Sequence, residues 1–214
     1  MTGREAFLDR LRTRLAVPAP ENLPHPLVPV EGVPAVAYNL DLDDPVAAFE
    51  RAATAAGATV RRGGLADAGD IVAEVLATVG ARTAVVAGDL DVDITLPAGV
   101  EALPFDSPVQ CERADLGITG AAYGIAATGS LVLHAGAAGG RTASLLPPVH
   151  LAFLRTERLL RDAGELFRRL GERFPGGLPS QLVLVTGPSR SADIELEVTV
   201  GVHGPRQLWI GVLT

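Results

Sequence analysis

The chain has 214 residues, 48% of them hydrophobic and 20% charged, an ordinary globular composition that excludes disorder along the whole length. Its formal net charge is −7 and its arginines are scattered, so a surface that follows a nucleic-acid backbone is not expected. The chain has no lysine and one cysteine, Cys111. These counts exclude a Walker-type phosphate loop, a lysine Schiff base, an internal disulfide and an iron–sulfur cluster ligated by this chain alone.

The N-terminal part, residues 1–34, is expected to be a helix followed by an arm. Apolar side chains recur at helical spacing over residues 3–16, and prolines recur from residue 18 to 34, where they disfavour regular structure. The main domain is expected over residues 35–214. The sequence opens without a continuous apolar leader, and its cysteine usage suits a reducing compartment, so we expect a cytoplasmic protein.

Beyond the arm, β-rich runs alternate with amphipathic helices. Helices are expected over 45–56, over 67–79, and from a cap at Thr156 through residue 170. Strands are expected at 58–61, 83–87, 131–133, 149–154, 182–185 and 208–212. The alternation predicts an α/β fold with helices covering a mainly parallel sheet, and a ligand at the carboxyl ends of the strands.

The stretch from Leu116 to Leu154 carries one charge, Arg141, and many glycines. The glycines, hydroxyls and a histidine make a poor lipid-facing helix, so they favour tight turns and close backbone approaches in a buried sheet. Groups suited to a carboxylate or phosphate occur in three short motifs of this stretch. The candidate ligand-binding residues are Thr119, Gly120, Thr128, Gly129 and Arg141; the alternative is turn chemistry alone.

A second candidate segment follows the expected strand at 182–185. Ser189 and Arg190 come after a glycine turn, where a helix or turn start would aim backbone N–H groups at an anion and the guanidinium could pair with it. The alternative is an internal pair of Arg190 with Asp193 or Glu195. A pocket is therefore expected between the loops of Arg141 and Arg190.

The candidates for acid or base chemistry are His150 and Asp193. His150 stands at the start of an apolar strand, where a histidine is more often structural than catalytic. The spacing of the four histidines gives no metal-binding signature, so no metal site is expected.

Four motifs in a fixed order resemble the LUD family, and within it the lactate-utilisation C branch. They lie at residues 117–130, 144–150, 187–195 and 201–205. The resemblance implies a three-layer α/β/α fold of the phosphosugar isomerase and CoA-transferase type. It also implies an accessory role in a three-protein system that oxidises L-lactate to pyruvate, in which iron–sulfur clusters belong to the partner proteins and this chain has no redox centre or cofactor of its own.

Two positions depart from the family pattern, since Ala122 and Ala127 stand where relatives commonly carry acidic residues. A mechanism that needs either carboxylate as nucleophile or base is therefore excluded here. The leading expectation is an accessory protein that binds a small anionic metabolite and iron–sulfur partners, without contact to nucleic acid or membrane. The alternatives are a stand-alone enzyme on a small phosphorylated or carboxylated metabolite, and a structural adaptor that uses the helix at 3–16.

Overall fold

The computed structural model describes residues 3–15, 44–88, 90–134, 141–173, 179, 181–194 and 197–214. The chain divides into two units, Met1–Ala37 and Tyr38–Thr214. In the first unit, α1 (Gly3–Leu15) is the helix that the apolar spacing predicts. The proline-rich arm and the expected start of the domain at residue 35 lie outside the described residues.

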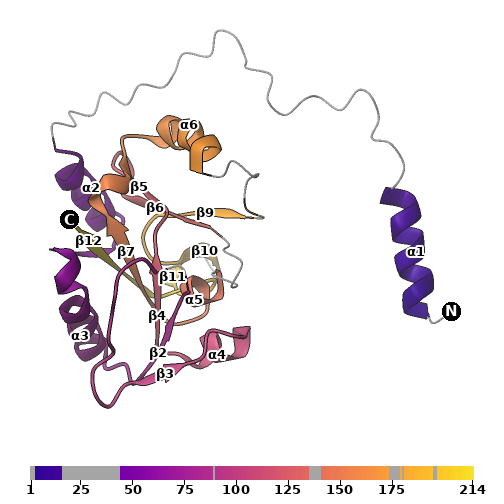
Figure 1. Ribbon diagram of the computed structural model, residues 1–214, viewed down its shortest axis with the longest axis horizontal. Helices are drawn as coiled ribbons and strands as arrows, with labels where there is room; N and C mark the ends of the chain where they lie inside the picture. The colour runs from indigo at the N-terminus through magenta and orange to yellow at the C-terminus, as the bar shows by residue number, and fades with distance from the viewer. Residues whose placement is uncertain are drawn as a thin grey trace, which may run out of the picture. The chain divides into compact units, whose positions relative to one another are not determined.

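Within the described residues of the second unit, six parallel strands form the main sheet, in the order β1–β12–β7–β4–β2–β3 (Figure 1). In that order their bounds are Thr59–Gly63, Gln207–Leu213, Val149–Arg155, Leu116–Gly120, Thr83–Val86 and Glu101–Leu103. The first six residues of β7 are all buried, as an uncharged strand covered on both faces should be. The predicted α/β class with a mainly parallel sheet is confirmed.

Helices cover both faces of this sheet. The helix α3 (Ala68–Val79), which follows the short turn η1 (Leu65–Asp67), packs on the face that carries Leu151 and Phe153. The helix α2 (Pro45–Ala55) packs on the opposite face. It starts where the sequence predicts because the Asp44 side chain accepts a hydrogen bond from the Ala47 N–H at 2.9 Å.

A second sheet, which the sequence analysis does not foresee, lies over the face that α2 covers. Its strands run in the order β8–β5–β6–β9, with bounds Leu159–Leu160, Tyr123–Ile125, Ser130–His134 and Leu182–Val185. β6 pairs antiparallel with both β5 and β9. Leu131 and Leu133 of β6 pack into the core beneath, and α6 (Ala163–Arg173) packs on the outer side through Leu166 and Leu170.

The long helix predicted from Thr156 is wrong. The chain forms a short turn η2 (Thr156–Arg158), then β8, and the helix α6 begins only at Ala163. The Asp162 side chain accepts a hydrogen bond from the Glu165 N–H at 2.8 Å, and this cap fixes the later start. Leu159 and Leu160 pair with β5 instead of extending the helix.

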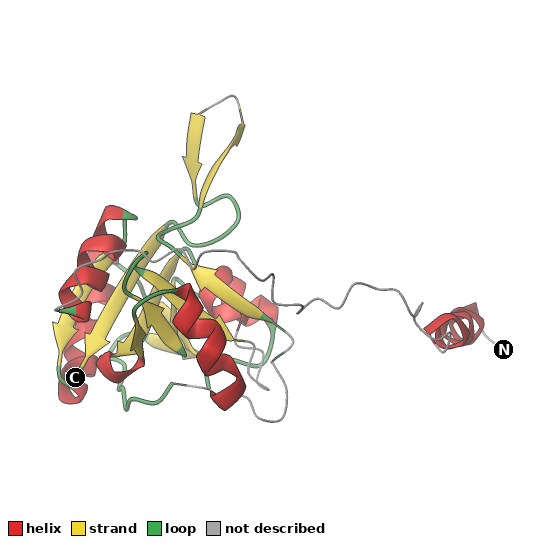
Figure 2. Ribbon diagram, turned by 90° about the horizontal axis from the view of Figure 1, so that it is seen from above, coloured by secondary structure: helices red, strands yellow, loops and turns green. Residues whose placement is uncertain are grey.

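The remaining elements are short. The helices α4 (Pro108–Arg113) and α5 (Arg141–Leu145) pack beside β2 and β4, and the strands β10 (Arg190–Ile194) and β11 (Glu197–Val200) form an antiparallel hairpin that stands out from the body (Figure 2). The segment after β9 therefore turns at Gly187 and enters a strand, so of the helix or turn start expected there the helix is wrong. Over the described residues, we find no helix long and apolar enough to cross a membrane.

Candidate functional site

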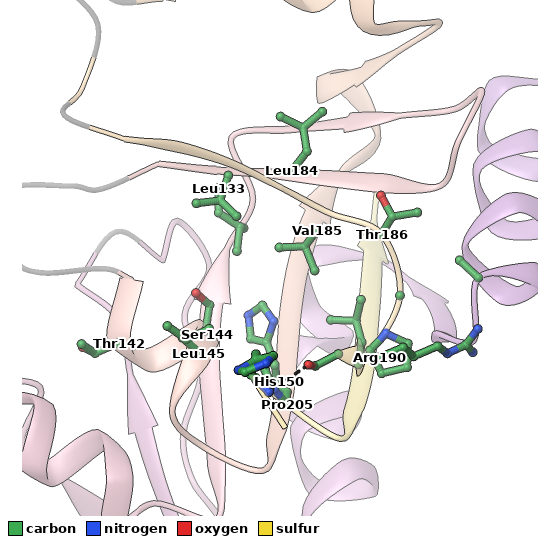
Figure 3. A pocket seen from close by; sticks show the side chains of 18 of the residues that line it. Leu133, Thr142, Ser144, Leu145, His150, Leu184, Val185, Thr186, Arg190 and Pro205 are labelled. Carbon is green, nitrogen blue, oxygen red and sulfur yellow. Dashed lines mark hydrogen bonds between the residues drawn. The ribbon is translucent and has the colours of Figure 1, made fainter. Parts of the chain in front are cut away.

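A cavity of about 720 Å³ lies between the main sheet, the edge strand β9 and the short helix α5 (Figure 3). The main sheet contributes His150 and Leu208, which are the second residues of β7 and β12 and are neighbours across that strand pair. The cavity thus opens at the amino ends of these strands, whereas the sequence rule placed a ligand at carboxyl ends. After β4 the chain enters the second sheet, whose strands β6 and β9 also line the cavity.

His150 is the most buried polar group of the cavity, with 1% of its surface exposed. Its Nε2 lies 2.9 Å from the Thr119 hydroxyl, and no described residue hydrogen-bonds its Nδ1. Burial lowers the pKa of His150 to about 4, so the ring is neutral near neutral pH. A group whose pKa lies this far below the operating pH is a weak general base, so His150 suits hydrogen bonding better than proton transfer.

Thr119 is therefore placed behind His150 and does not itself line the cavity. Thr128 is also set back: its hydroxyl contacts Ser130 Oγ at 2.7 Å, and Ser130 Oγ contacts the Thr186 hydroxyl at 2.6 Å. Of these three, Thr186 reaches the cavity, and the sequence analysis did not single it out. Thr128 can therefore influence a ligand only through this chain of hydroxyls.

Neither glycine candidate borders the cavity, and Gly129 serves packing. Gly129 has φ +65°, and a Cβ there would overlap the backbone nitrogen of Ala53 in α2. Gly120 is the last residue of β4, and neither glycine lines the cavity. For Gly129 the alternative interpretation, a turn with a close backbone approach, is the one that the structure favours.

Ser189 and Arg190 both line the cavity. Ser189 Oγ accepts a hydrogen bond from the His203 N–H at 3.3 Å, which ties the two loops together. The guanidinium of Arg190 lies over Gly57, just past the C-terminal end of α2, and Figure 3 shows its side chain leading away from His150. The carbonyl groups of a helix end favour a cation in such a place.

The side chains of Arg141 and Asp193 and all of Glu195 lie outside the described part of the structure, so the internal pairing proposed for Arg190 stays untested. Arg141 is the first residue of α5. Three other residues of this helix, Thr142, Ser144 and Leu145, line the cavity. The helix of Arg141 and the loop of Arg190 thus border the same space, where the sequence analysis expects a pocket.

The charged groups of the cavity favour an anion, because Arg190 lines it and no Asp or Glu does so among the described residues. Three of the four histidines of the chain, His134, His150 and His203, also line it and can form hydrogen bonds. Sequence reasoning missed His134 and did not use His203, although His203 stands in one of the quoted motifs. Ala122 and Ala127 do not line the cavity. Within the described residues, no three His, Cys, Asp or Glu side chains are placed to hold a metal ion.

Comparison with known proteins adds a similarity to a family. The model of the LUD domain matches residues 109–213, the segment that holds every lining residue except Ala56. This segment, just under half of the chain, is therefore similar to the LUD domain family. "Lactate utilization protein C" of Halalkalibacterium halodurans is 42% identical over 98 residues, 45% of this chain and 43% of that protein.

Two further proteins agree with this similarity. "Uncharacterized protein YkgG" of Escherichia coli K12 is 41% identical over 98 residues, 45% of this chain and 42% of that protein. The match to these two curated relatives therefore spans less than half of their length. A crystal structure of a DUF162 family protein from Deinococcus radiodurans superposes with a TM-score of 0.61 at 25% identity. The superposed region covers 79% of this chain and 96% of that chain, so the two proteins share their fold.

Proposed function

We propose that this chain takes part in L-lactate utilisation, as an accessory component that binds a small anionic metabolite in the cavity described above. The observation that carries the proposal is the coincidence of two features in one segment. Residues 109–213 match the LUD domain model and hold nearly all of the cavity, and relatives aligned with this chain are named lactate utilization protein C. The absence of acidic groups from the described lining supports an anionic ligand.

The redox step is assigned to partner proteins that carry iron–sulfur clusters. Oxidation of lactate to pyruvate removes two electrons and two protons, and the lone, buried Cys111 of this chain could not hold a cluster by itself. This chain would then supply a ligand site, a docking surface, or both. Co-purification of the tagged full-length chain with cluster-bearing proteins tests this part, and its recovery without such partners contradicts it.

Growth on lactate tests the proposal as a whole. Deletion of the gene is expected to abolish or strongly slow growth on L-lactate as sole carbon source and to leave growth on pyruvate unchanged. A plasmid copy should restore growth when it encodes the wild type or Arg169→Ala, a change on the exposed surface of α6. The copy with Arg190→Ala, at the cavity, should restore growth poorly. Normal growth of the deletion strain on lactate contradicts the proposal.

A further inference from the structure

The cavity has a buried floor and an exposed rim, and the two differ in chemistry. The floor is formed by Leu133, His150 and Leu208, none of which is more than 7% exposed. The rim carries the exposed side chains of Arg190 and His203. The floor is thus apolar apart from one imidazole, while Arg190 and His203 lie on the exposed rim. A ligand that fills the whole space meets both environments.

The cationic part of the rim is built by two loops joined at Ser189. The Ser189 N–H donates to the Pro205 carbonyl at 2.9 Å, and its hydroxyl accepts from the His203 N–H. These bonds hold the His203 backbone beside Ser189, the residue that precedes Arg190, whose guanidinium lies further out over Gly57. Leu145 and Leu184, each 50% exposed, also line the cavity and add apolar surface near its mouth. The anionic group of a ligand is therefore expected at the Ser189 side.

The floor carries Nδ1 of His150, and no described residue hydrogen-bonds this atom, while Thr119 holds the other ring nitrogen. Because the buried ring is neutral, it does not attract a negative charge, but it can form one more hydrogen bond. A hydroxyl group suits this place best, because it can accept from the N–H tautomer or donate to the other one.

The volume of the cavity argues against a compact acid as its full occupant. At about 30 Å³ per water molecule, about 720 Å³ corresponds to roughly two dozen waters, and the cavity falls in the range that holds drug-sized ligands. A three-carbon acid such as lactate fills a small part of it. Lactate also carries its hydroxyl and carboxylate on neighbouring carbons, so it cannot extend from the rim to His150 on the floor.

We propose that the cavity binds an elongated hydroxycarboxylate, with the carboxylate at Ser189, Arg190 and His203 and an apolar body along Leu133 and Leu208. A neutral hydroxyl at the far end of the ligand bonds His150 Nδ1. The inference rests on the proposed function only in taking this cavity as the ligand site. It narrows the ligand to molecules whose charge and hydroxyl are separated by several carbons.

Calorimetric titration of the full-length chain tests the proposal with three sets of probes. These are ω-hydroxyalkanoates of four to ten carbons, the alkanoates of the same length, and the α,ω-diols; L-lactate is titrated in parallel. At the best length, the hydroxyalkanoate should bind about fivefold more tightly than its alkanoate, the usual effect of one neutral hydrogen bond. It should also bind at least tenfold more tightly than lactate, because it covers more apolar surface.

Two variants locate the ends of the ligand. Arg190→Ala should weaken the binding of every carboxylate about tenfold and leave the affinity for the diols unchanged, as expected for the loss of a charge-assisted contact. The exposed Arg169→Ala is the matched control and should change neither. His150→Phe, which keeps a flat ring without nitrogens, should remove the preference for the hydroxyl. If His150→Phe does not fold, Arg190→Ala with the diol comparison still decides the position of the charge.

Three results overturn the inference: no binding of any probe, lactate binding as tightly as the longer acids, or no difference between hydroxyalkanoate and alkanoate in the wild type. The failure of the proposed function is distinguishable from these results. Normal growth of the deletion strain on lactate removes the role in lactate utilisation and leaves the measured ligand preference standing. Poor growth together with failed titrations removes the elongated ligand and retains the role.

Discussion

At the scale of single residues, the buried imidazole of His150 is the group whose behaviour the structure specifies best. Its pKa falls to about 4 in the folded chain, from an ordinary value of about 6.5. Between these values the unfolded chain binds a proton that the folded chain does not, so stability falls as the pH drops through this window. Lowering the pH from 7.5 to 4.5 should therefore cost roughly 2–3 kcal/mol through His150.

Urea unfolding of the wild type and of His150→Phe at both pH values measures this contribution as the difference between the two proteins. Other titrating groups act on both proteins alike, so they cancel in that difference. His203→Gln, on an exposed loop, is the matched control for the loss of one histidine. An equal loss of stability in His150→Phe and in the wild type contradicts the depressed pKa.

At the scale of elements, the junction between α2 and the turn before β6 depends on Gly129. Gly129→Ala should destabilise the fold by at least about 3 kcal/mol, because it adds backbone strain at φ +65° and forces a methyl group into the backbone of α2. Gly80→Ala is the matched control: Gly80 has φ +68° and open space where a Cβ would lie. It should cost only about 1 kcal/mol. Equal urea midpoints for the two variants contradict the close approach.

Which elements the sequence predicts depends on whether their signals are local. The helices predicted at 45–56 and 67–79 match α2 and α3 within one residue, because Asp44 caps one start and Gly80 ends the other. The predicted helix from Thr156 fails because pairing with β5, far earlier in the chain, draws Leu159 and Leu160 into a strand. Helical periodicity carries no information about such a partner.

At the scale of the whole molecule, pairing between strands distant in sequence also limits how much of the site can be predicted from the sequence. Ser189, Arg190 and His150 are found from motifs, and they do line one cavity. The second sheet, which also lines this cavity, requires Leu131 of β6 to meet Val185 of β9. These two residues are far apart in sequence, so a pocket near the Arg141 and Arg190 loops could be predicted, but the second sheet and the position at the amino ends of the strands could not.

The two-unit organisation predicts how the chain responds to truncation. Among the described residues, each hydrophobic core cluster of the second unit consists of residues from Val46 onward. Removing Met1–Ala37 should therefore leave the thermal midpoint of the remainder within about 2 °C of that of the full chain, measured by calorimetry. Leu151→Ala, in the fully buried part of β7, is the positive control for destabilisation: its free energy of unfolding should fall by about 2–5 kcal/mol, which lowers the thermal midpoint. A truncated chain that melts several degrees lower contradicts this independence.

Since a helix of 13 residues is marginal alone in water, a stable remainder would favour α1 as a segment that docks on another protein.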